Sequence, residues 1–240
     1  MRLTVVSKPA TDMERRKQNI AASKPYPRFV PQENIGGPVA ICAAGPSLIT
    51  SLPIIRAYAE AGIPICAIKG VASVLLDHGI IPKYAVFLDS RPDQIRLLGT
   101  THPDTIYCMG STVDPALFEK LSAEGRDIRV WNGAELQLFT EPNTDYILGG
   151  STTGLKAINL MRWAGYTVPH LFGYDCCLDE AGTSHVYDKA NLSRALKVTI
   201  AGGDFTVTPE FVCQHQEFIE QYVAVEEPLN ITVHGNGAIA

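Results

Sequence analysis

The chain has 240 residues, a length that corresponds to one large α/β-sized domain or two small ones. Hydrophobic residues make up 46% of the chain and charged residues 19%, so it can bury a core, and disorder throughout is excluded. The formal net charge is −5, which divides into +4 over residues 1–34 and −9 over residues 35–240. The acidic body excludes nonspecific binding to nucleic acid, because such binding needs basic residues that neutralise phosphates.

The cysteines and the N-terminus indicate a compartment. Of the six cysteines none forms a CxxC pair, and Cys42, Cys66 and Cys108 lie in apolar runs, as is typical of reduced, core-packing thiols. The N-terminus lacks the apolar region of a secretion signal, and no apolar run is long enough to cross a bilayer. We therefore expect a cytoplasmic protein with no membrane partner.

The chain divides into an N-terminal arm and one domain. Residues 1–34 are polar and rich in proline, with a short helix expected over 12–23 and an extended stretch over 25–33. From residue 38 onward, buried-strand runs alternate with stretches of helical periodicity, which favours a parallel sheet covered on both faces. The expected strands are at 39–44, 65–68, 84–88, 105–109, 128–131 and 168–175. We expect residues 35–240 to form a Rossmann-like, doubly wound, mostly parallel α/β domain.

The final third of the chain departs from this alternation. Residues 195–207 predict a two-stranded hairpin around Gly202-Gly203. Residues 209–223 predict a helix with proline in its first turn, and residues 229–233 predict a last strand. The domain should therefore end in a hairpin-helix-strand extension.

Small, polar or charged residues follow nearly every predicted strand. Ligands of open parallel sheets bind beyond the carboxyl ends of the strands, so these positions are the candidates for a site. Turns favour the same residue types, which explains any single position equally well. Asp89 and Asp175 favour a functional interpretation, because aspartate is an unusual end for a buried strand. The candidate strand ends are Gly45-Pro46-Ser47, Lys69-Gly70, Asp89, Gly110-Ser111, Asn132 and Asp175.

Two glycine-containing turns could hold a phosphate. In Gly45-Pro46-Ser47 the glycine permits close approach of a ligand, and Ser47 is expected to cap the next helix and leave its first amides facing an anion. The stretch Gly150-Ser151-Thr152 opens a predicted helix over 151–164 and offers hydroxyl groups for an anion or a sugar. A capped strand-to-helix turn and an ordinary Ser N-cap remain open as alternatives. Neither turn matches a Walker A or GxGxxG pattern.

Acidic and imidazole groups complete the candidate set. Asp89, just past a strand, could hold Mg²⁺ together with nucleotide phosphates, whereas Asp93 is better explained as a first-turn helix carboxylate. His185 lies in a polar loop after the strand that ends at Asp175, where an imidazole can act as a general base. A solvated surface histidine is the alternative. Cys176 and Cys177 have no zinc spacing with His185.

Several segments, in this order along the chain, resemble the MptE-like (DUF115) family. That family includes archaeal 6-hydroxymethylpterin diphosphokinase and bacterial motility accessory factors linked to flagellin glycosylation. The resemblance implies a Rossmann-like fold. The segments are Gly45-Pro46-Ser47-Leu48; Gly79-Ile80-Ile81-Pro82 leading to Asp89; Gly149-Gly150-Ser151; Gly173-Tyr174-Asp175 with Ser184-His185; and Thr206 to Phe211 with Asn230-Ile231-Thr232.

The resemblance also implies roles for these residues. The turn at Gly45, Pro46 and Ser47 would hold the nucleotide, Asp89 would face phosphates and Mg²⁺, and Asp175 and His185 would line the acceptor side. The implied reaction is Mg²⁺-dependent transfer of diphosphate from ATP to a hydroxyl acceptor such as a pterin. The Gly-Pro-Ser-Leu turn also resembles that of sialyltransferase-like glycosyltransferases, so transfer from a nucleotide sugar is the first alternative. A non-catalytic nucleotide- or sugar-binding accessory protein is the second.

Departures from the family pattern make the acceptor the least transferable part. The usual Thr-His-Ala is replaced by Ser184-His185-Val186, two cysteines follow Asp175, and the glycine-rich close is altered at 234–238. The expected partners are a small-molecule nucleotide and a hydroxyl acceptor. The sequence leaves a homo-oligomer open.

Overall fold

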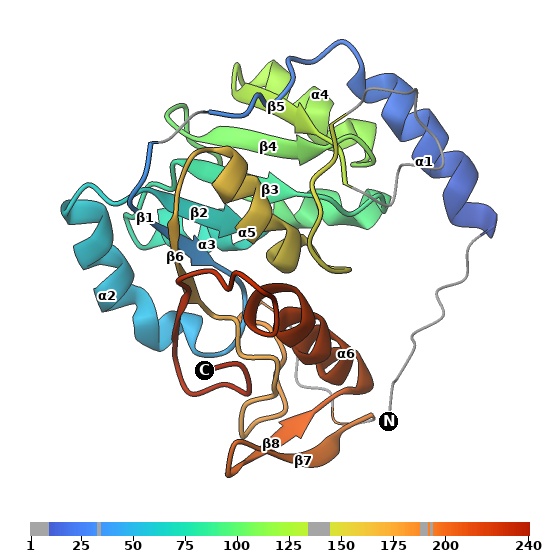
Figure 1. Cartoon of the computed structure of the whole chain (residues 1–240). Helices are drawn as coiled ribbons and strands as arrows, with labels where there is room; N and C mark the ends of the chain where they lie inside the picture. The colour runs from blue at the N-terminus through green and yellow to red at the C-terminus, as the bar shows by residue number, and fades with distance from the viewer. Residues whose placement is uncertain (1–9, 33–34, 134–144, 188–191, 193) are drawn as a thin grey trace.

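The protein is built on a parallel sheet. The computed structural model describes residues 10–32, 35–133, 145–187, 192 and 194–240, and over these ranges the main sheet has seven strands in the order β5-β4-β3-β2-β1-β6-β9 (Figure 1). All pairings between neighbouring strands are parallel. The bounds are β1 (Pro38–Cys42), β2 (Ile65–Ile68), β3 (Tyr84–Phe87), β4 (Ile106–Gly110), β5 (Asp127–Trp131), β6 (Val168–Phe172) and β9 (Thr232–His234).

Helices cover both faces of the sheet because the central strands are apolar at every position. All four residues of β2 and of β3 are buried. One face packs against helices α2 (Leu48–Glu60), α3 (Val71–Asp77) and α4 (Pro115–Ala123), and the other packs against α5 (Thr153–Trp163). The predicted doubly wound, Rossmann-like architecture is confirmed. After β3 the chain forms only a short 3₁₀ helix, η1 (Pro92–Leu97), which ends just before Gly99 at φ +51°.

The strand order places a switch point between β1 and β6. From β1 the chain moves outward through β2, β3 and β4 to β5, and it then returns to the other side of β1 to form β6. At such a point the connections on either side diverge and leave a crevice at the carboxyl ends of the two strands. The fold therefore directs attention to the residues that follow Cys42 and Phe172.

The described part of the N-terminal arm packs on the sheet. Helix α1 (Ala10–Ser23) buries Asn19, whose side-chain amide donates hydrogen bonds to the backbone oxygens of Thr112 and Ser90 at 2.8 and 3.3 Å. Further along, the amide of Phe29 donates to the carbonyl of Val130 in β5 at 2.8 Å. These contacts close the carboxyl ends of β3 and β4, and they leave the crevice beside β1 uncovered by α1.

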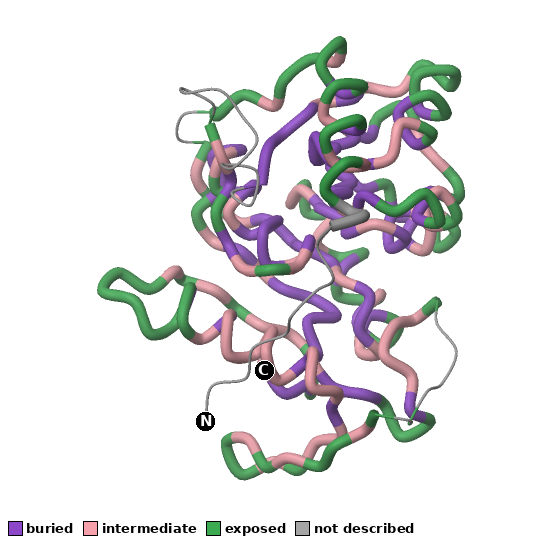
Figure 2. The backbone as a smooth tube through the Cα atoms, turned by 90° about the vertical axis from the view of Figure 1, so that its right-hand side faces the viewer, coloured by how far each residue is buried: buried purple, intermediate pink, exposed green. Residues whose placement is uncertain are grey.

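The C-terminal extension forms a separate small layer. Strands β7 (Leu196–Ile200) and β8 (Gly203–Val207) form the expected antiparallel hairpin, and helix α6 (Pro209–Phe218) follows. Figure 1 shows the hairpin projecting from the body. Most residues of β7 and β8 are exposed or half-buried, whereas the main sheet is largely buried (Figure 2). The end of the expected helix is a π-helical segment, η3 (Ile219–Val223).

The last strand is shorter and lies later than the pattern predicts. Strand β9 comprises Thr232–His234, whereas the apolar pattern indicated 229–233. The reason is local, because the amide of Ile231 donates to the carbonyl of Leu229 at 2.8 Å instead of joining the ladder with β6. Leu229 and Ile231 still pack against the core, so their apolar character serves packing without strand pairing.

Two features used in the sequence analysis, the cysteines and the absence of long apolar segments, can be compared with the structure. All six cysteines are free, and Cys42, Cys66 and Cys108 are fully buried, as expected; burial raises the pKa of each thiol. Within the ranges that the structure describes, no helix combines the length and the apolar character that crossing a bilayer requires.

Candidate functional site

A cavity of about 220 Å³ lies at the switch point, beyond the carboxyl ends of β1 and β6. Its floor is formed by residues 43–45 after β1 and 173–176 after β6, and one wall is the first turn of α5, residues 152–155. Lys69, at the end of β2, and His185 belong to the polar lining, together with Ser184, Tyr187 and Gln214. Four of the residues predicted from the sequence therefore meet in one cavity: Gly45, Thr152, Asp175 and His185. Pro46, Ser47, Gly150, Ser151 and Asp89 are not among the residues that line it.

Asp175 is buried and bonded to the turn at Gly45. The side chain of Asp175 accepts a hydrogen bond from the backbone amide of Ser47 at 2.8 Å and another from the Ser47 hydroxyl at 2.6 Å. The expected cap by the Ser47 hydroxyl is therefore wrong, because that hydroxyl donates to Asp175 and makes no bond to the first turn of α2. The anion at this helix N-terminus is a carboxylate of the chain itself, and a phosphate at the Ser47 amide would compete with it.

Gly45 is required by a contact between backbones. A Cβ atom at Gly45 would lie 2.4 Å from Oδ2 of Asp175 and 2.5 Å from the carbonyl oxygen of Gly173. The amide of Gly45 donates to that same carbonyl at 2.9 Å. The turns after β1 and β6 thus touch without intervening side chains, which explains the glycine without a ligand. The prediction that Gly45 approaches a phosphate stays a prediction.

The second glycine-containing turn also meets a carboxylate of the chain. Ser151 donates from its amide and from its hydroxyl to Oε2 of Glu217 in α6, both at 2.9 Å. The carbonyl of Gly150 accepts from the ammonium of Lys156 at 2.7 Å. The N-cap of α5 is Thr152, whose hydroxyl accepts from the amide of Leu155 at 3.1 Å. Of this turn, Thr152 alone lines the cavity, and it does so at a helix N-terminus.

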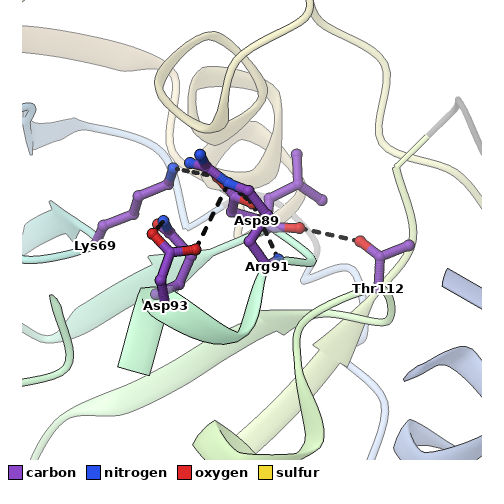
Figure 3. Close-up of polar contacts among 7 residues, drawn as sticks. Lys69, Asp89, Arg91, Asp93 and Thr112 are labelled. Carbon is purple, nitrogen blue, oxygen red and sulfur yellow. Dashed lines mark hydrogen bonds and ion pairs between the residues drawn. The ribbon is translucent and has the colours of Figure 1, made fainter. Parts of the chain in front are cut away.

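Asp89 lies between two cations at the ends of β2 and β3 (Figure 3). Arg91 donates from Nε to Oδ1 at 3.0 Å and from an Nη atom to Oδ2 at 2.8 Å, and Lys69 Nζ lies 3.4 Å from Oδ2. Asp93 is exposed and lies 4.0 Å from Arg91. The Thr112 hydroxyl donates to the carbonyl of Leu88 at 3.0 Å, which fixes the backbone just before Asp89. The cluster is thus positioned by β3 and β4 and reaches the cavity through Lys69.

Burial and charge act in opposite directions on this cluster. Burial raises the pKa of Asp89, but the hydrogen bonds from Arg91 and the charge of Lys69 outweigh it and hold that pKa below the ordinary value. Burial also lowers the pKa of Lys69, and Asp89 opposes that decrease. Asp89 is therefore an anion at neutral pH, and its charge helps to keep Lys69 protonated.

The predicted Mg²⁺ site at Asp89 finds no supporting ligand set. Among the described residues, no three His, Cys, Asp or Glu side chains gather where they could hold a metal ion. Both carboxylate oxygens of Asp89 are bonded to Arg91, so a cation could bind there only after Arg91 moved away. That Asp89 holds Mg²⁺ together with nucleotide phosphates therefore stays a prediction.

The imidazole of His185 is held by its neighbours in the sequence. Nδ1 lies 3.0 Å from the hydroxyl of Ser184, and the ring stacks on Tyr187 with centroids 5.6 Å apart and planes 8° apart. The amide of Val186 donates to the carbonyl of Ala44 at 2.8 Å, which ties this loop to the turn after β1. His185 therefore has a defined position in the cavity.

Backbone strain marks the cavity as well. Lys69 has φ +52° and Cys176 has φ +47°, which is the left-handed region that non-glycine residues rarely occupy. Both residues line the cavity, at the ends of the two strands that flank β1. Strain of this kind concentrates at functional sites. Lys69 was visible in the sequence as a strand end, but its charge was not singled out; Tyr187 was missed because no pattern marks it.

The family follows from comparison with known proteins. The family model described as 6-hydroxymethylpterin diphosphokinase MptE-like matches residues 14–181, which is more than half of the chain. The chain belongs to the MptE-like family. No curated protein matches the sequence of this MptE-like chain.

A solved structure shares the fold of the MptE-like chain. It is the MAf glycosyltransferase from Magnetospirillum magneticum AMB-1, with a TM-score of 0.68 and 16% sequence identity. The match covers 92% of this chain but only 38% of the glycosyltransferase, so the MptE-like chain spans well under half the length of that protein. The likeness shows a common fold.

Proposed function

We propose that this MptE-like chain is a transferase that binds the phosphate of a nucleotide donor at Lys69 and transfers a group to a hydroxyl acceptor. The observation that carries the proposal is that Lys69 and His185 line one cavity at the switch point of the sheet. A cation and a candidate base in the same crevice are the two groups that such a transfer needs.

The donor side is supported by charge and by a helix terminus. An ammonium has three N–H donors, and Asp89 takes one of those of Lys69, so the same ammonium can also contact a phosphate. The first turn of α5, with Thr152 at its N-cap, presents the positive end of a helix dipole to the cavity. Both features stabilise the negative charge that develops on a leaving phosphate.

The acceptor side is supported by the placement of His185. When the Ser184 hydroxyl accepts a hydrogen bond from Nδ1–H, the imidazole keeps its lone pair on Nε2. That nitrogen would take the proton of the acceptor hydroxyl as its oxygen attacks the donor, and the bond to the phosphate breaks with the electron pair going to the leaving group. Asp175 takes no part in this step, because both of its oxygens are bonded to Ser47; it positions the turn.

Of the two kinds of transfer, glycosyl transfer from a nucleotide sugar is the better supported. A nucleoside triphosphate reacts as its Mg²⁺ complex, and Asp89 is bonded to Arg91 through both oxygens. The glycosyltransferase that shares the fold agrees with this choice, although its likeness extends to the fold alone. Diphosphate transfer is the second candidate, and the description of the family favours it.

A ligand screen by thermal shift tests the proposal. ATP with and without Mg²⁺ would be compared with CMP-, UDP- and GDP-sugars. A ligand that binds the folded state alone stabilises it by about 2.7 kcal/mol at a hundred times its Kd. We expect a nucleotide sugar to raise the Tm without added metal. A rise with Mg-ATP alone would favour the second candidate, and no rise with any nucleotide would overturn the proposal. Tight binding without group transfer to any hydroxyl would indicate the accessory protein.

A further inference from the structure

Two histidines on neighbouring strands lie end to end beside the last segment of the chain. Nδ1 of His170 in β6 is 3.2 Å from Nε2 of His234 in β9, and the ring centroids are 5.5 Å apart. Each nitrogen lies about half a ring width from the centroid of its own ring. The centroid separation exceeds the N···N distance by about twice that length, so both nitrogens lie near the line that joins the two centroids. This is the arrangement of an N–H···N hydrogen bond in which the two rings share one proton.

The surroundings of the pair disfavour a second proton. The titratable group that faces it from α2 is Tyr58, whose hydroxyl lies 3.2 Å from the same Nδ1 of His170; Phe172 stacks on His234 at 4.2 Å. Within the described residues, neither ring has a carboxylate hydrogen-bonded to it. Burial lowers the pKa of both histidines, and for His234 the charge of His170 lowers it further. A second proton would therefore bring two imidazolium cations into contact.

The pair is joined directly to the wall of the cavity. Strand β9 has three residues and, among the described strands, pairs only with β6, so few backbone hydrogen bonds hold it. Immediately after His234, the chain packs on Asp175: the amide of Ala238 donates to the Asp175 carbonyl at 2.7 Å, and a Cβ on Gly237 would lie 2.3 Å from the Asp175 Cα. Ile239 then lines the cavity.

We infer that His170 and His234 form a pH-sensitive latch that holds residues 232–240 against Asp175 and the cavity. While the rings share one proton, the latch is closed and the segment completes the cavity wall. When both rings are protonated, like charges in contact separate β9 from β6, and the segment leaves Asp175. A short edge strand is the kind of element that opens locally while the rest of the fold stays intact.

The direction of the pH dependence follows from the lowered pKa values. In the closed latch the two histidines bind fewer protons than in the open one. The contribution of the pair to the free energy of closing is therefore fully present above the ordinary histidine pKa. It is lost as the pH falls from that value through the depressed pKa values of the pair. The device does not depend on the proposed transfer reaction, because it acts on the protein without a ligand.

Hydrogen exchange on the intact chain tests the inference. After correction for the intrinsic exchange rate, protection of amides in 232–240 should fall by about tenfold between pH 7.5 and 5.5, while protection in β1 stays constant. In His170→Gln, which keeps a hydrogen-bond donor but does not titrate, this fall should disappear. His234→Gln provides a second variant should the first misfold, and His78→Gln, at an exposed position, is the matched control.

Three outcomes would overturn the latch. The first is protection in 232–240 that is independent of pH in the natural chain. The second is a fall of the same size in His170→Gln or His234→Gln, which would assign the titration to other groups. The third is a loss of protection in β1 and β6 together with β9, which would mean that acid unfolds the whole sheet and that no local latch exists.

Discussion

Asp175 and Asp89 both follow buried strands at the same edge of the sheet, yet their surroundings differ. Asp175 is 5% exposed, and both of its oxygens accept hydrogen bonds from Ser47, at the N-terminus of a helix. Asp89 lies among side chains that reach solvent, with Arg91 57% exposed and Lys69 on the cavity. The difference teaches that a carboxylate at a strand end can hold two turns together, or can keep a neighbouring cation protonated for ligand binding. We assign the first role to Asp175 and the second to Asp89.

The largest expected effect is a loss of turnover from a substitution in the solvent-accessible cavity. In His185→Gln, turnover of the donor should fall by about 10²- to 10⁴-fold, because the side chain keeps a similar shape but cannot take the acceptor proton at neutral pH. The Kd of the donor should change little. Initial rates and calorimetric binding measure the two quantities. Equal turnover would remove His185 from the mechanism, and an equal loss of affinity would make it a binding residue.

The next largest effect is a loss of stability at the buried Asp175. Asp175→Asn replaces a charged acceptor of two hydrogen bonds with an amide, and the free energy of unfolding should fall by about 3 kcal/mol. Urea denaturation measures the loss, with Asp93→Asn as the control at an exposed aspartate. The structural role of Asp175 would be contradicted by an unfolding free energy within error of that of the natural chain.

Much of the fold follows from the sequence, because local patterns determine it. Runs of four or five apolar residues, as in β2 and β3, produce buried strands wherever they occur, and the residues after them reach one edge of the sheet. This logic predicts that Gly45, Asp89, Asp175 and His185 converge at one mouth of the sheet. Gly45, Asp175 and His185 line one cavity, whereas Asp89 lies outside its lining and contacts it through Lys69. The positions of β9 and η3 depended on packing against the finished core, which no local pattern contains.

The partners of the anion-binding turns lay outside such reasoning. The sequence predicts that the turns at Ser47 and Ser151 face an anion such as a phosphate. In both cases the anion is a carboxylate of the same chain, Asp175 at a separation of 128 residues and Glu217 at a separation of 66. A sequence pattern shows that a donor group exists, but only the tertiary structure shows what it already binds.

A smaller effect sharpens the contrast between binding and stability. In Lys69→Met, affinity for the donor should fall about tenfold, because a single charge-assisted hydrogen bond is lost. Stability should stay nearly constant or rise slightly, since burial of the ammonium is unfavourable. Calorimetric titration and urea denaturation report the two quantities, with Lys197→Met on the exposed hairpin as the control. Unchanged affinity would place the phosphate elsewhere.

Asp89→Asn is expected to have a small effect on both stability and binding. Arg91 is 57% exposed, so solvent screens its ion pair with the partly buried Asp89, and loss of the pair should cost less than about 1 kcal/mol. Without Asp89, the largest opposition to burial is lost and the pKa of Lys69 falls further. As the pH is raised, donor affinity should therefore decline at a lower pH than in the natural chain. Affinity measured from pH 7 to 10 checks this shift.

The same variant separates the two candidate functions. If Asp89 holds Mg²⁺ with a nucleotide, Asp89→Asn should abolish metal-dependent binding at every pH and leave Tm nearly unchanged. If Asp89 instead sustains the charge of Lys69, binding at neutral pH should survive without metal. A result of the first kind would restore the diphosphate-transfer candidate.

A crystal structure with the nucleotide that most raises the Tm tests the central claim most directly. The account predicts a phosphate oxygen within hydrogen-bond distance of Lys69 Nζ, while both hydrogen bonds between Ser47 and Asp175 remain. A phosphate that displaces the Asp175 carboxylate from the Ser47 amide, or one that binds outside the cavity, would contradict it.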